Sequence, residues 1–411
     1  MTNKGGVMTS STQEIKNMKL ISHHDLNGYG NIGEGVAIHK TRDGRRIFYM
    51  AHVAAPKDIT SVDVTDINNP KLIAQTDLDY PHLRSNSLSI VGDTMLVAYQ
   101  STDHNQPGTG VGVYDISNAE EPRRIGFWNA QGPQSKGCHC LWWVDGEYAH
   151  LSSGTPDSRP TNSKDDQFYV ILDVKNPSNP VEAGRWHFPG TQEGDSAPPL
   201  ARHPQFDAGH SLHNANVYPD RPDRAYCAWK DSGVVTLDIS DKSNISMIAN
   251  LNYAPPFPGF THTVLPMFNR EMLVVTQESV RQGGEDWPKL VWLMDNRVES
   301  NPIITSTLPM ADTEDFFNRP GRYGAHNVYE NQPGETSLIN EDLVFGTFFN
   351  AGIRVFDIKN PFQPEEVAYF VPEIPEGADA NGINDIHVDE NGIMYVVDRI
   401  KGGMYILELN I

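Results

Sequence analysis

Residues 213–238 contain three apolar runs in quick succession: His213-Asn-Ala-Asn-Val, Arg224-Ala-Tyr-Cys-Ala-Trp and Gly233-Val-Val-Thr-Leu-Asp. Apolar side chains recur at every second position in these runs, which is the pattern of a β-strand. The first run has counterparts along the whole chain, and each starts 49 to 74 residues after the one before it. The seven are Glu34-Gly-Val-Ala-Ile, Asn86-Ser-Leu-Ser-Ile, His139-Cys-Leu-Trp-Trp, His213-Asn-Ala-Asn-Val, His262-Thr-Val-Leu-Pro, His326-Asn-Val-Tyr-Glu and Asn384-Asp-Ile-His-Val. A period of this length predicts a repeated structural unit.

A second mark, an aspartate followed seven residues later by a proline, returns in the same register. The pairs are Asp63 and Pro70, Asp115 and Pro122, Asp173 and Pro180, Asp295 and Pro302, and Asp357 and Pro364, while Asp238 has Ile245 at the proline position. Aspartate side chains bond the backbone of turns and proline fixes φ, so each mark predicts a strand that ends in a turn. One more short strand follows, as in Glu365-Glu-Val-Ala-Tyr-Phe. Seven units of four strands predict an all-β fold, a seven-bladed β-propeller.

The two ends of the chain are expected to complete one blade together. The last unit ends with its third strand, Met404-Tyr-Ile-Leu-Glu-Leu, and lacks a fourth. Met18-Lys-Leu-Ile-Ser, near the other end, resembles the strands that follow the prolines. Pairing of these two segments locks the ring and covers two sheet edges. We therefore expect a polar N-terminal tail over residues 1–17 and a single propeller domain over residues 18–411.

The order of strands and turns resembles that of LVIVD-repeat proteins. The stretches that carry the resemblance are Gly112-Val-Tyr-Asp-Ile-Ser, Val234-Val-Thr-Leu-Asp-Ile-Ser and Ile353-Arg-Val-Phe-Asp-Ile. The resemblance covers about residues 18–411 and implies a propeller. It implies no reaction, because that family is defined by a repeat.

Composition limits the class of partner. The formal net charge is −21 and no basic run offsets it, so we expect binding neither to nucleic acid nor to anionic membrane surfaces. The longest apolar runs, such as Leu273-Val-Val, are too short for a membrane span. The polar residues 1–19 and the three cysteines predict neither a secretory signal nor a disulfide framework. We expect a cytoplasmic protein with a small-molecule substrate, and the oligomeric state is left open.

The first strand of each blade lines the channel of a propeller, so the seven starts place their first residues around the axis. Blades three to six contribute His139, His213, His262 and His326, which predict a metal site. Neutral imidazoles suit a divalent transition metal; we favour Fe(II), with Cu, Zn, Mn or Ni as alternatives. A different interpretation is that these histidines only form hydrogen bonds within their blades. Four in register, replaced in the other blades only by Glu or Asn, favour the metal.

The remaining axial residues, Glu34, Asn86 and Asn384, form an arc opposite the histidines. Glu34 is the candidate catalytic residue, and three roles are open for it: a fifth ligand, an acceptor that orients an imidazole, or a general base. Asn86 and Asn384 are candidates for substrate binding.

Long loops are expected to gather on one face of the ring and to cap the channel. His210 and Tyr323, which lie on these loops, are predicted to bind substrate; the alternatives are a solvated loop histidine and an aromatic residue packed between blades. Six aromatic residues near the channel mouth form either an apolar pocket or, more commonly for such residues, blade-to-blade packing: Trp142, Trp143, Phe260, Phe316, Phe317 and Tyr323. Six further loop residues are candidates for substrate contact by position alone, and most of them are expected to be ordinary surface residues: His52, His104, Lys230, Glu278, Arg281 and Arg399.

The ring of four histidines is similar to that of carotenoid-cleavage oxygenases, seven-bladed propellers whose four axial histidines hold non-haem iron. It is more loosely similar to selenium-binding, methanethiol-oxidase propellers. The resemblance is confined to His139, His213, His262 and His326 and implies an oxidoreductase or oxygenase acting on a small, fairly apolar molecule. Two alternatives remain: a metal-dependent lyase, hydratase or hydrolase with Glu34 as general base, and a non-enzymatic binding scaffold.

Overall fold

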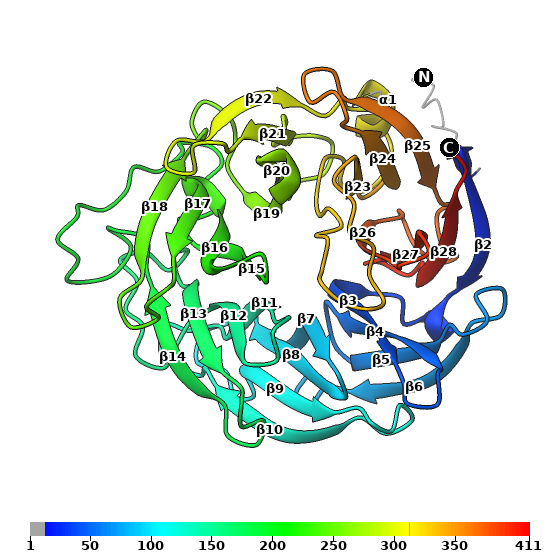
Figure 1. The fold of residues 1–411 in the computed structure, drawn as a ribbon, viewed down its shortest axis with the longest axis horizontal. Helices are drawn as coiled ribbons and strands as arrows, with labels where there is room; N and C mark the ends of the chain where they lie inside the picture. The colour runs from blue at the N-terminus through cyan, green and yellow to red at the C-terminus, as the bar shows by residue number, and fades with distance from the viewer. Residues whose placement is uncertain (1–12, 312) are drawn as a thin grey trace, which may run out of the picture.

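The computed structural model describes residues 13–311 and 313–411, which form seven four-stranded antiparallel sheets arranged around a central axis (Figure 1). This is the predicted seven-bladed β-propeller. Within a blade the strands follow one another from the axis to the rim, so each blade begins at the channel. Since the starts of the repeats are at the axis, their first residues face one another.

The blades are built from consecutive strands, with the N-terminal strands inserted into the last two. Blade one comprises β3 (Ile32–Lys40), β4 (Arg46–His52), β5 (Lys57–Asp63) and β6 (Lys71–Asp77), and blade two comprises β7 (Leu83–Val91), β8 (Thr94–Ser101), β9 (Gly110–Asp115) and β10 (Arg123–Asn129). Blade three comprises β11 (Cys138–Trp142), β12 (Tyr148–Ser153), β13 (Phe168–Asp173) and β14 (Val181–Trp186). Blade four comprises β15 (Leu212–Tyr218), β16 (Arg221–Trp229), β17 (Gly233–Asp238) and β18 (Ser246–Leu251). Blade five comprises β19 (Thr261–Met267), β20 (Met272–Gln277), β21 (Val291–Asp295) and β22 (Ile303–Thr307). Blade six comprises β23 (Leu343–Thr347), β24 (Ile353–Asp357), β25 (Glu365–Val371) and β1 (Glu14–Lys16). Blade seven comprises β26 (Ile383–Val388), β27 (Ile393–Asp398), β28 (Met404–Leu409) and β2 (Met18–His24).

Helical structure is confined to short connections in the described part of the chain. These are α1 (Thr313–Asn318) and three 3-10 turns at Leu26–Gly28, Lys230–Ser232 and Phe268–Arg270. Among the described residues, no helix has the length and apolar character needed to cross a membrane.

The aspartate marks of the repeat cap the turns between the third and fourth strands, as predicted. Asp63 Oδ1 accepts a hydrogen bond from the Thr65 backbone N–H at 2.9 Å, and Asp357 Oδ1 accepts one from the Lys359 N–H at 2.8 Å. The same bond recurs at Asp115, Asp173, Asp238 and Asp295. The Asx turn therefore repeats in six blades and sets where each third strand ends.

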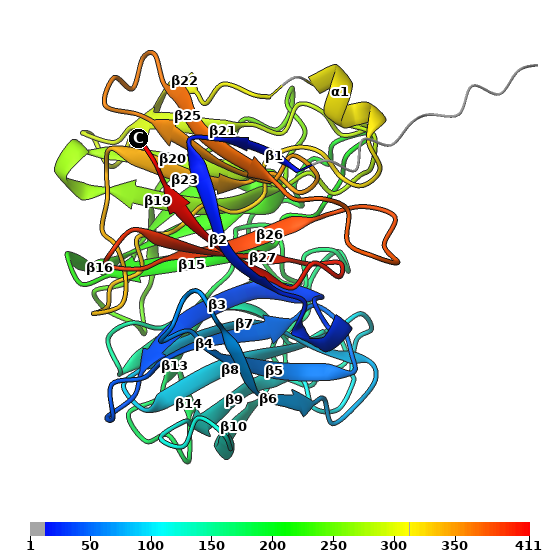
Figure 2. The same ribbon diagram turned by 90° about the vertical axis from the view of Figure 1, so that its right-hand side faces the viewer.

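The first and last strands close the ring. β2 pairs antiparallel with β28, from Met18 opposite Leu409 to His24 opposite Met404, and the two lie side by side at the rim (Figures 1 and 2). This pairing confirms the predicted closure. The propeller begins before residue 18, however, because β1 pairs with β25 on the rim of blade six. The predicted boundary missed β1 because this edge strand has a single apolar residue, Ile15; the rest of the predicted tail, residues 1–12, lies outside the described residues.

Blade six departs from the predicted pattern at its inner edge. The segment that begins at His326 was expected to form a regular strand, but it makes only a local bridge between Val328 and Gly346. Backbone bonds still link it to β23, with the His326 N–H donating to the Thr347 oxygen at 3.0 Å. The Asn327 side chain accepts from the Val328 N–H and so replaces part of the strand ladder. The segment keeps the position of a first strand without its regular form.

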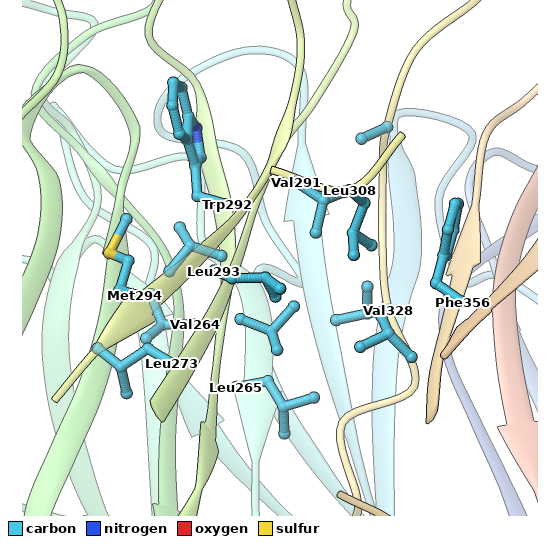
Figure 3. Packing of buried hydrophobic residues seen from close by; sticks show 14 of the residues in the cluster. Val264, Leu265, Leu273, Val291, Trp292, Leu293, Met294, Leu308, Val328 and Phe356 are labelled. Atoms are coloured by element: carbon cyan, nitrogen blue, oxygen red, sulfur yellow. The ribbon is translucent and has the colours of Figure 1, made fainter. Parts of the chain in front are cut away.

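The apolar faces of neighbouring blades pack against each other around the ring. Figure 3 shows this packing between blades five and six, where Val264, Leu273 and Leu293 lie beside Val328 and Phe356. All five side chains are almost completely buried. Because the sheets pack face to face in this way, the inner strands are held rigidly and the axial residues have fixed positions.

Candidate metal centre at the propeller axis

A β-bulge in the inner strand presents the axial residue in most blades. The pairing register shifts between Cys138 and Cys140, between Leu212 and Asn214, and between Thr261 and Thr263, that is, at His139, His213 and His262. Comparable shifts occur in β3 at Ile32–Val36, in β7 at Arg84–Ser87 and in β26 at Ile383–Asp385. A bulge leaves one residue out of the strand ladder and redirects its side chain. The repeated bulge explains how residues of a strand come to point into the channel.

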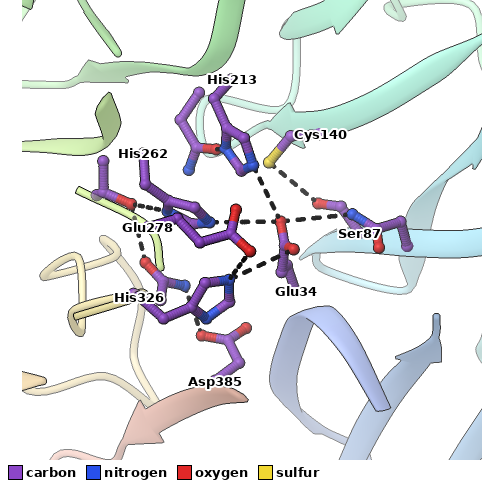
Figure 4. Close-up of polar contacts among 12 residues, drawn as sticks. Glu34, Ser87, Cys140, His213, His262, Glu278, His326 and Asp385 are labelled. Atoms are coloured by element: carbon purple, nitrogen blue, oxygen red, sulfur yellow. Dashed lines mark hydrogen bonds and ion pairs between the residues drawn. The ribbon is translucent and has the colours of Figure 1, made fainter. Parts of the chain in front are cut away.

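The four predicted metal ligands meet around Glu34. The Nε2 atoms of His139, His213 and His262 lie 3.6, 3.6 and 3.7 Å from Glu34 Oε2, and that of His326 lies 3.6 Å from Glu34 Oε1. Figure 4 shows the imidazoles of blades four to six turned toward this carboxylate. Nε2 of His139 is 2.9 Å from Nε2 of His213. Two nitrogens that bind one ion at right angles, each at about 2.1 Å, are about 3 Å apart.

Each imidazole is oriented by a bond to its other nitrogen. Nδ1 of His213 lies 2.7 Å from Asn214 Oδ1, and Nδ1 of His326 lies 2.7 Å from the Asn384 carbonyl oxygen. Both partners only accept, so the Nδ1 atoms carry the protons and each Nε2 presents a lone pair to the axis. Nδ1 of His139 is 2.9 Å from Gln100 Oε1 and 3.1 Å from Arg84 Nη2. Such acceptors behind the ring are what orient histidine ligands in metal sites.

The fourth histidine is held by a chain of hydrogen bonds. Nδ1 of His262 donates to Thr263 Oγ1 at 2.8 Å, and the Thr263 hydroxyl donates in turn to Asn327 Oδ1 at 3.0 Å. The Asn327 amide donates to Asp385 Oδ1 at 2.7 Å. A similar chain runs from His213 through Asn214, whose amide lies 3.2 Å from Glu330 Oε1. Two buried carboxyl groups therefore anchor the imidazoles from the side opposite the axis.

Burial favours the neutral, metal-binding form of three of the imidazoles, those of His139, His213 and His262. Burial lowers the pKa of His139 and His262, and it lowers the pKa of His213 to about 3. Burial alone raises the pKa of Glu34, but the contacts with His262 and His326 outweigh it and hold that pKa well below its usual range. In the described part of the chain, the buried Nε2 atoms of His262 and His326 have no hydrogen-bond partner. An ion is the partner that four lone pairs and a carboxylate can share.

A second carboxylate, Glu278, lies beside the ring. Its Oε1 is 3.8 Å from His326 Nε2 and 2.8 Å from an Arg322 guanidinium nitrogen. Burial raises the pKa of Glu278, but the proximity of the His326 imidazole and of the Arg322 guanidinium outweighs it and lowers that pKa to about 2. Potential ligand atoms within 4.8 Å of one another form two overlapping groups, Glu34–His213–His262 and His262–Glu278–His326. Glu278 follows β20 in a loop, and the repeat pattern carried no signal for it beyond its place on the capped face.

A cavity of about 410 Å³ opens above the ring, with Glu34, His139 and His213 at its base. Its walls include Thr102, Lys164, Asp166 and Ala208, which belong to the long loops that were predicted to cap one face. Most lining side chains are polar or charged, and Phe260 is the aromatic residue among those that the structure describes. The cavity therefore does not suit the fairly apolar substrate implied by the oxygenase resemblance.

The four residues predicted to bind substrate form hydrogen bonds within the protein. Asn86 Nδ2 contacts the His139 carbonyl oxygen at 3.2 Å and Glu34 Oε2 at 3.5 Å, so it supports the ring. Asn384 Nδ2 donates to the Gly33 carbonyl oxygen at 2.6 Å. His210 bonds Ser232 at 2.7 Å, and the hydroxyl of the buried Tyr323 donates to the Ala311 carbonyl oxygen. None of these four is among the described residues that line the cavity. Their predicted contact with substrate therefore has no support from position.

Comparison with known proteins identifies the repeat but indicates no reaction. The LVIVD repeat matches residues 165–187, which contain the last two strands of blade three, and residues 223–253, which contain the last two of blade four. The chain contains LVIVD repeats. In both matches the LVIVD segment runs through the aspartate turn to the rim of the blade, and neither segment contains one of the four axial histidines. A search among curated proteins gave no significant match.

Solved structures share the propeller architecture of this LVIVD-repeat chain. The β-propeller domain of Cps50 (Swd1) from Myceliophteria thermophila is 13% identical, with a TM-score of 0.54 and coverage of 96% of this chain and 99% of that chain. A chain of a mitotic checkpoint complex is 9% identical, with a TM-score of 0.56 and coverage of 99% and 97%. At this level of identity, the likeness concerns the fold alone.

Proposed function

We propose that the axial cluster binds a divalent transition metal and that the protein is a metal-dependent oxidoreductase acting on a small molecule in the cavity. The main support is the convergence of four imidazole Nε2 atoms on Glu34 at 3.6–3.7 Å. These distances are too long for good hydrogen bonds, and they leave room for an ion. Nitrogen-rich ligand sets suit iron, copper, zinc and nickel, and Fe(II) remains the favoured ion, with Cu, Zn or Mn as alternatives.

In this proposal His139, His213, His262 and His326 are ligands and Glu34 is a fifth. Glu34 directs Oε2 at three imidazoles and Oε1 at the fourth, so both of its oxygens face the cluster. This geometry favours a ligand over the general base that a lyase or hydrolase needs. Four nitrogens and one carboxylate leave a position of a six-coordinate ion open, and the cavity adjoins it. When bound, an iron or copper ion supplies electron-transfer chemistry there.

A non-enzymatic scaffold is the competing proposal, because the propeller fold serves binding as often as catalysis. The two structural neighbours are named for a propeller domain and for a protein complex, and protein partners are compatible with the fold. A surface used only for docking does not account for four oriented imidazoles at the bottom of a cavity. Metal content separates the two proposals.

Elemental analysis of untagged protein from metal-replete cells is the decisive experiment. We expect close to one equivalent of a transition metal in the wild type and its loss in His213→Ala and in His262→Ala. His82→Ala is the matched control, since His82 bonds the Pro107 carbonyl oxygen at 3.0 Å away from the ring, and it should retain the metal. Circular dichroism and the Tm establish that each variant is folded.

Two results would contradict the proposal. A wild type that contains no metal would exclude the metal centre, and metal retained in both axial variants would place it elsewhere. Oxygen uptake tests the reaction class, because an oxidoreductase that uses oxygen loses turnover under nitrogen, whereas a lyase or hydrolase does not.

A further inference from the structure

Positive charge dominates the cavity above the axial cluster. Its lining includes five cationic side chains, Arg84, Lys136, Lys164, Lys230 and Arg399, and three carboxylates, Glu34, Asp166 and Glu278. The chain as a whole has the opposite balance, with 32 Lys and Arg against 53 Asp and Glu. A local reversal of charge in an otherwise acidic protein attracts anions to this cavity and repels them from the remaining surface.

Lys230 is the cation whose charge is least compensated. Within the described part of the chain it has no hydrogen bond or ion pair, and its Nζ lies over the Phe260 ring, 5.3 Å from the centroid. Burial lowers its pKa, against the raising effect of the Asp166 and Glu278 carboxylates. The charge of a half-buried ammonium group is favoured when an anion shares its site.

Arg84 and Arg399 also have unused capacity. Arg84 Nε and Nη2 contact Gln100 Oε1, and Nη2 lies 3.1 Å from His139 Nδ1, but in the described chain Nη1 has no hydrogen bond and no carboxylate lies within ion-pair distance of the guanidinium group. Nη1 of Arg399 is buried without a hydrogen bond, 3.9 Å from Glu278 Oε1. The lysines near the mouth differ, because Lys136 pairs with Asp166 at 3.2 Å and Lys164 pairs with Asp207 at 3.0 Å.

We propose that the cavity binds a small organic anion, with its carboxylate or other oxyanion group held by Lys230, Arg84 and Arg399. Ionised oxygens accept the strong hydrogen bonds that guanidinium and ammonium groups donate. Phe260 supplies an apolar wall for the carbon skeleton. The inference names the substrate class of the proposed oxidoreductase and rests on that function for the role of the anion as substrate, but binding itself needs only the cavity.

Isothermal titration with succinate tests the proposal, with succinamide as the neutral molecule of the same size. The protein is used both as purified and after removal of metal by a chelator, at low ionic strength. We expect succinate to bind both forms, and succinamide to bind neither. Lys230→Met and Arg399→Gln should each weaken succinate binding about tenfold or more, since each removes a charge-assisted contact. Lys359→Met is the matched control, because Lys359 pairs with Asp357 on an exposed turn, and it should bind like the wild type.

The outcomes separate this proposal from the metal centre. Equal succinate affinity in the wild type and both cavity variants would overturn it, as would succinate binding that is lost in His262→Ala and kept in Lys230→Met. Binding to metal-free protein that depends on Lys230 supports it even if the metal proposal fails. Inorganic phosphate is titrated in parallel: Lys230-dependent binding of phosphate in place of succinate assigns the anion to a phosphorylated molecule. Failure of both anions to bind at millimolar concentration would overturn the proposal.

Discussion

Nε2 of His139 lies 2.9 Å from Nε2 of His213, although the residues belong to different blades and are 74 positions apart. Asn214 Oδ1 accepts at the opposite nitrogen of His213, so Nε2 of His213 presents a lone pair, while Nδ1 of His139 lies 2.9 Å from Gln100 Oε1 and 3.1 Å from Arg84 Nη2. When Gln100 accepts the Nδ1 proton of His139, the two Nε2 lone pairs at this distance repel each other unless a cation lies close to both. The orientation of the imidazoles is therefore the property on which the proposed centre depends.

Removal of an acceptor behind the ring tests that orientation. Thr263→Val deletes the hydroxyl that accepts from His262 Nδ1 and donates to Asn327. All ligand atoms remain, but the tautomer and angle of one imidazole are no longer fixed. We expect metal affinity to fall by about 10- to 100-fold with little change in secondary structure. Competition with a chromophoric chelator measures the affinity.

Thr276→Val is the matched control for this substitution. Thr276 is buried in β20, and its hydroxyl has no hydrogen-bond partner in the described part of the chain. The same change of oxygen to methyl should leave metal affinity unaltered there. Equal affinity in Thr263→Val and the wild type would show that the chain from His262 to Asp385 does not support the centre.

Glycine next to Glu34 allows the first two blades to approach each other. A Cβ on Gly35 would lie 2.1 Å from the Leu88 nitrogen and 2.6 Å from Ser87 Cα. Gly35→Ala must move β3 away from β7 and Glu34 with it. We expect a loss of several kcal/mol in the free energy of unfolding, together with lower metal content. Gly334→Ala, where the nearest atom is Ser337 Oγ at 3.5 Å, should be close to neutral in urea denaturation.

The closing strand is tested by a buried charge. Met18 is 6% exposed and packs in the core of blade seven, where it pairs with Leu409. Met18→Asp is expected to lower the free energy of unfolding by about 3 kcal/mol or more, because a carboxylate is buried without a partner. Lys19→Gln, on the exposed face of the same strand, should cost less than about 1 kcal/mol. A similar midpoint for both variants in urea would show that β2 is dispensable for closure.

Asp58 makes stability depend on pH. Burial raises the pKa of this carboxyl from 3.8 to about 7, against the lowering effect of the hydrogen bonds from Tyr99 and Ser85. The folded protein thus holds a proton that the unfolded chain releases, and its stability falls as pH rises between about 4 and 7. Asp58→Asn removes this penalty. The gain of Asp58→Asn in the free energy of unfolding, relative to the wild type, should be about 2 kcal/mol larger at pH 8 than at pH 5.

Asp241→Asn provides the opposite case in the same measurement. Asp241 is an exposed turn residue, and hydrogen bonds from Ser243 lower its pKa. The contribution of Asp241 to the stability of the folded protein is therefore lost as pH falls. We expect Asp241→Asn to show no gain in the free energy of unfolding over the wild type at pH 8. If Asp58→Asn showed the same pH profile as the wild type, the buried carboxyl would not titrate as inferred.

The sequence predicted the ring because each axial residue occupies the same place in a repeat. Register alone was sufficient to bring Glu34, Asn86 and His139 to one axis, and the Asx turns at positions such as Asp63 followed from local chemistry. The bulges that aim the axial side chains were not predicted, because no residue type marks a bulge reliably. Their location at His139, His213 and His262 became apparent only from the strand pairing.

The parts of the site outside the repeat were poorly predicted for a physical reason. Glu278 and Lys230 lie in connections that occur once, so no internal comparison singled them out among other charged residues. His210 and Tyr323 illustrate the converse, since both are on the predicted loops but their hydrogen bonds are made within the protein. Position on a capping loop specifies a region of the surface, whereas orientation depends on contacts between distant segments.

The location of Glu34 in blade one has a consequence for how the molecule is assembled. Its partners come from blades three to six, so a bound ion would be a crosslink between the beginning of the chain and segments synthesised much later. The pairing of β2 with β28 is a second connection between the two ends of the chain, at the rim. If either connection were broken, the other would still keep the ring of blades closed. The proposed ligand set would be complete only after His326 has left the ribosome, so uptake of the proposed metal would be a late event that reports the assembly of blades one to six.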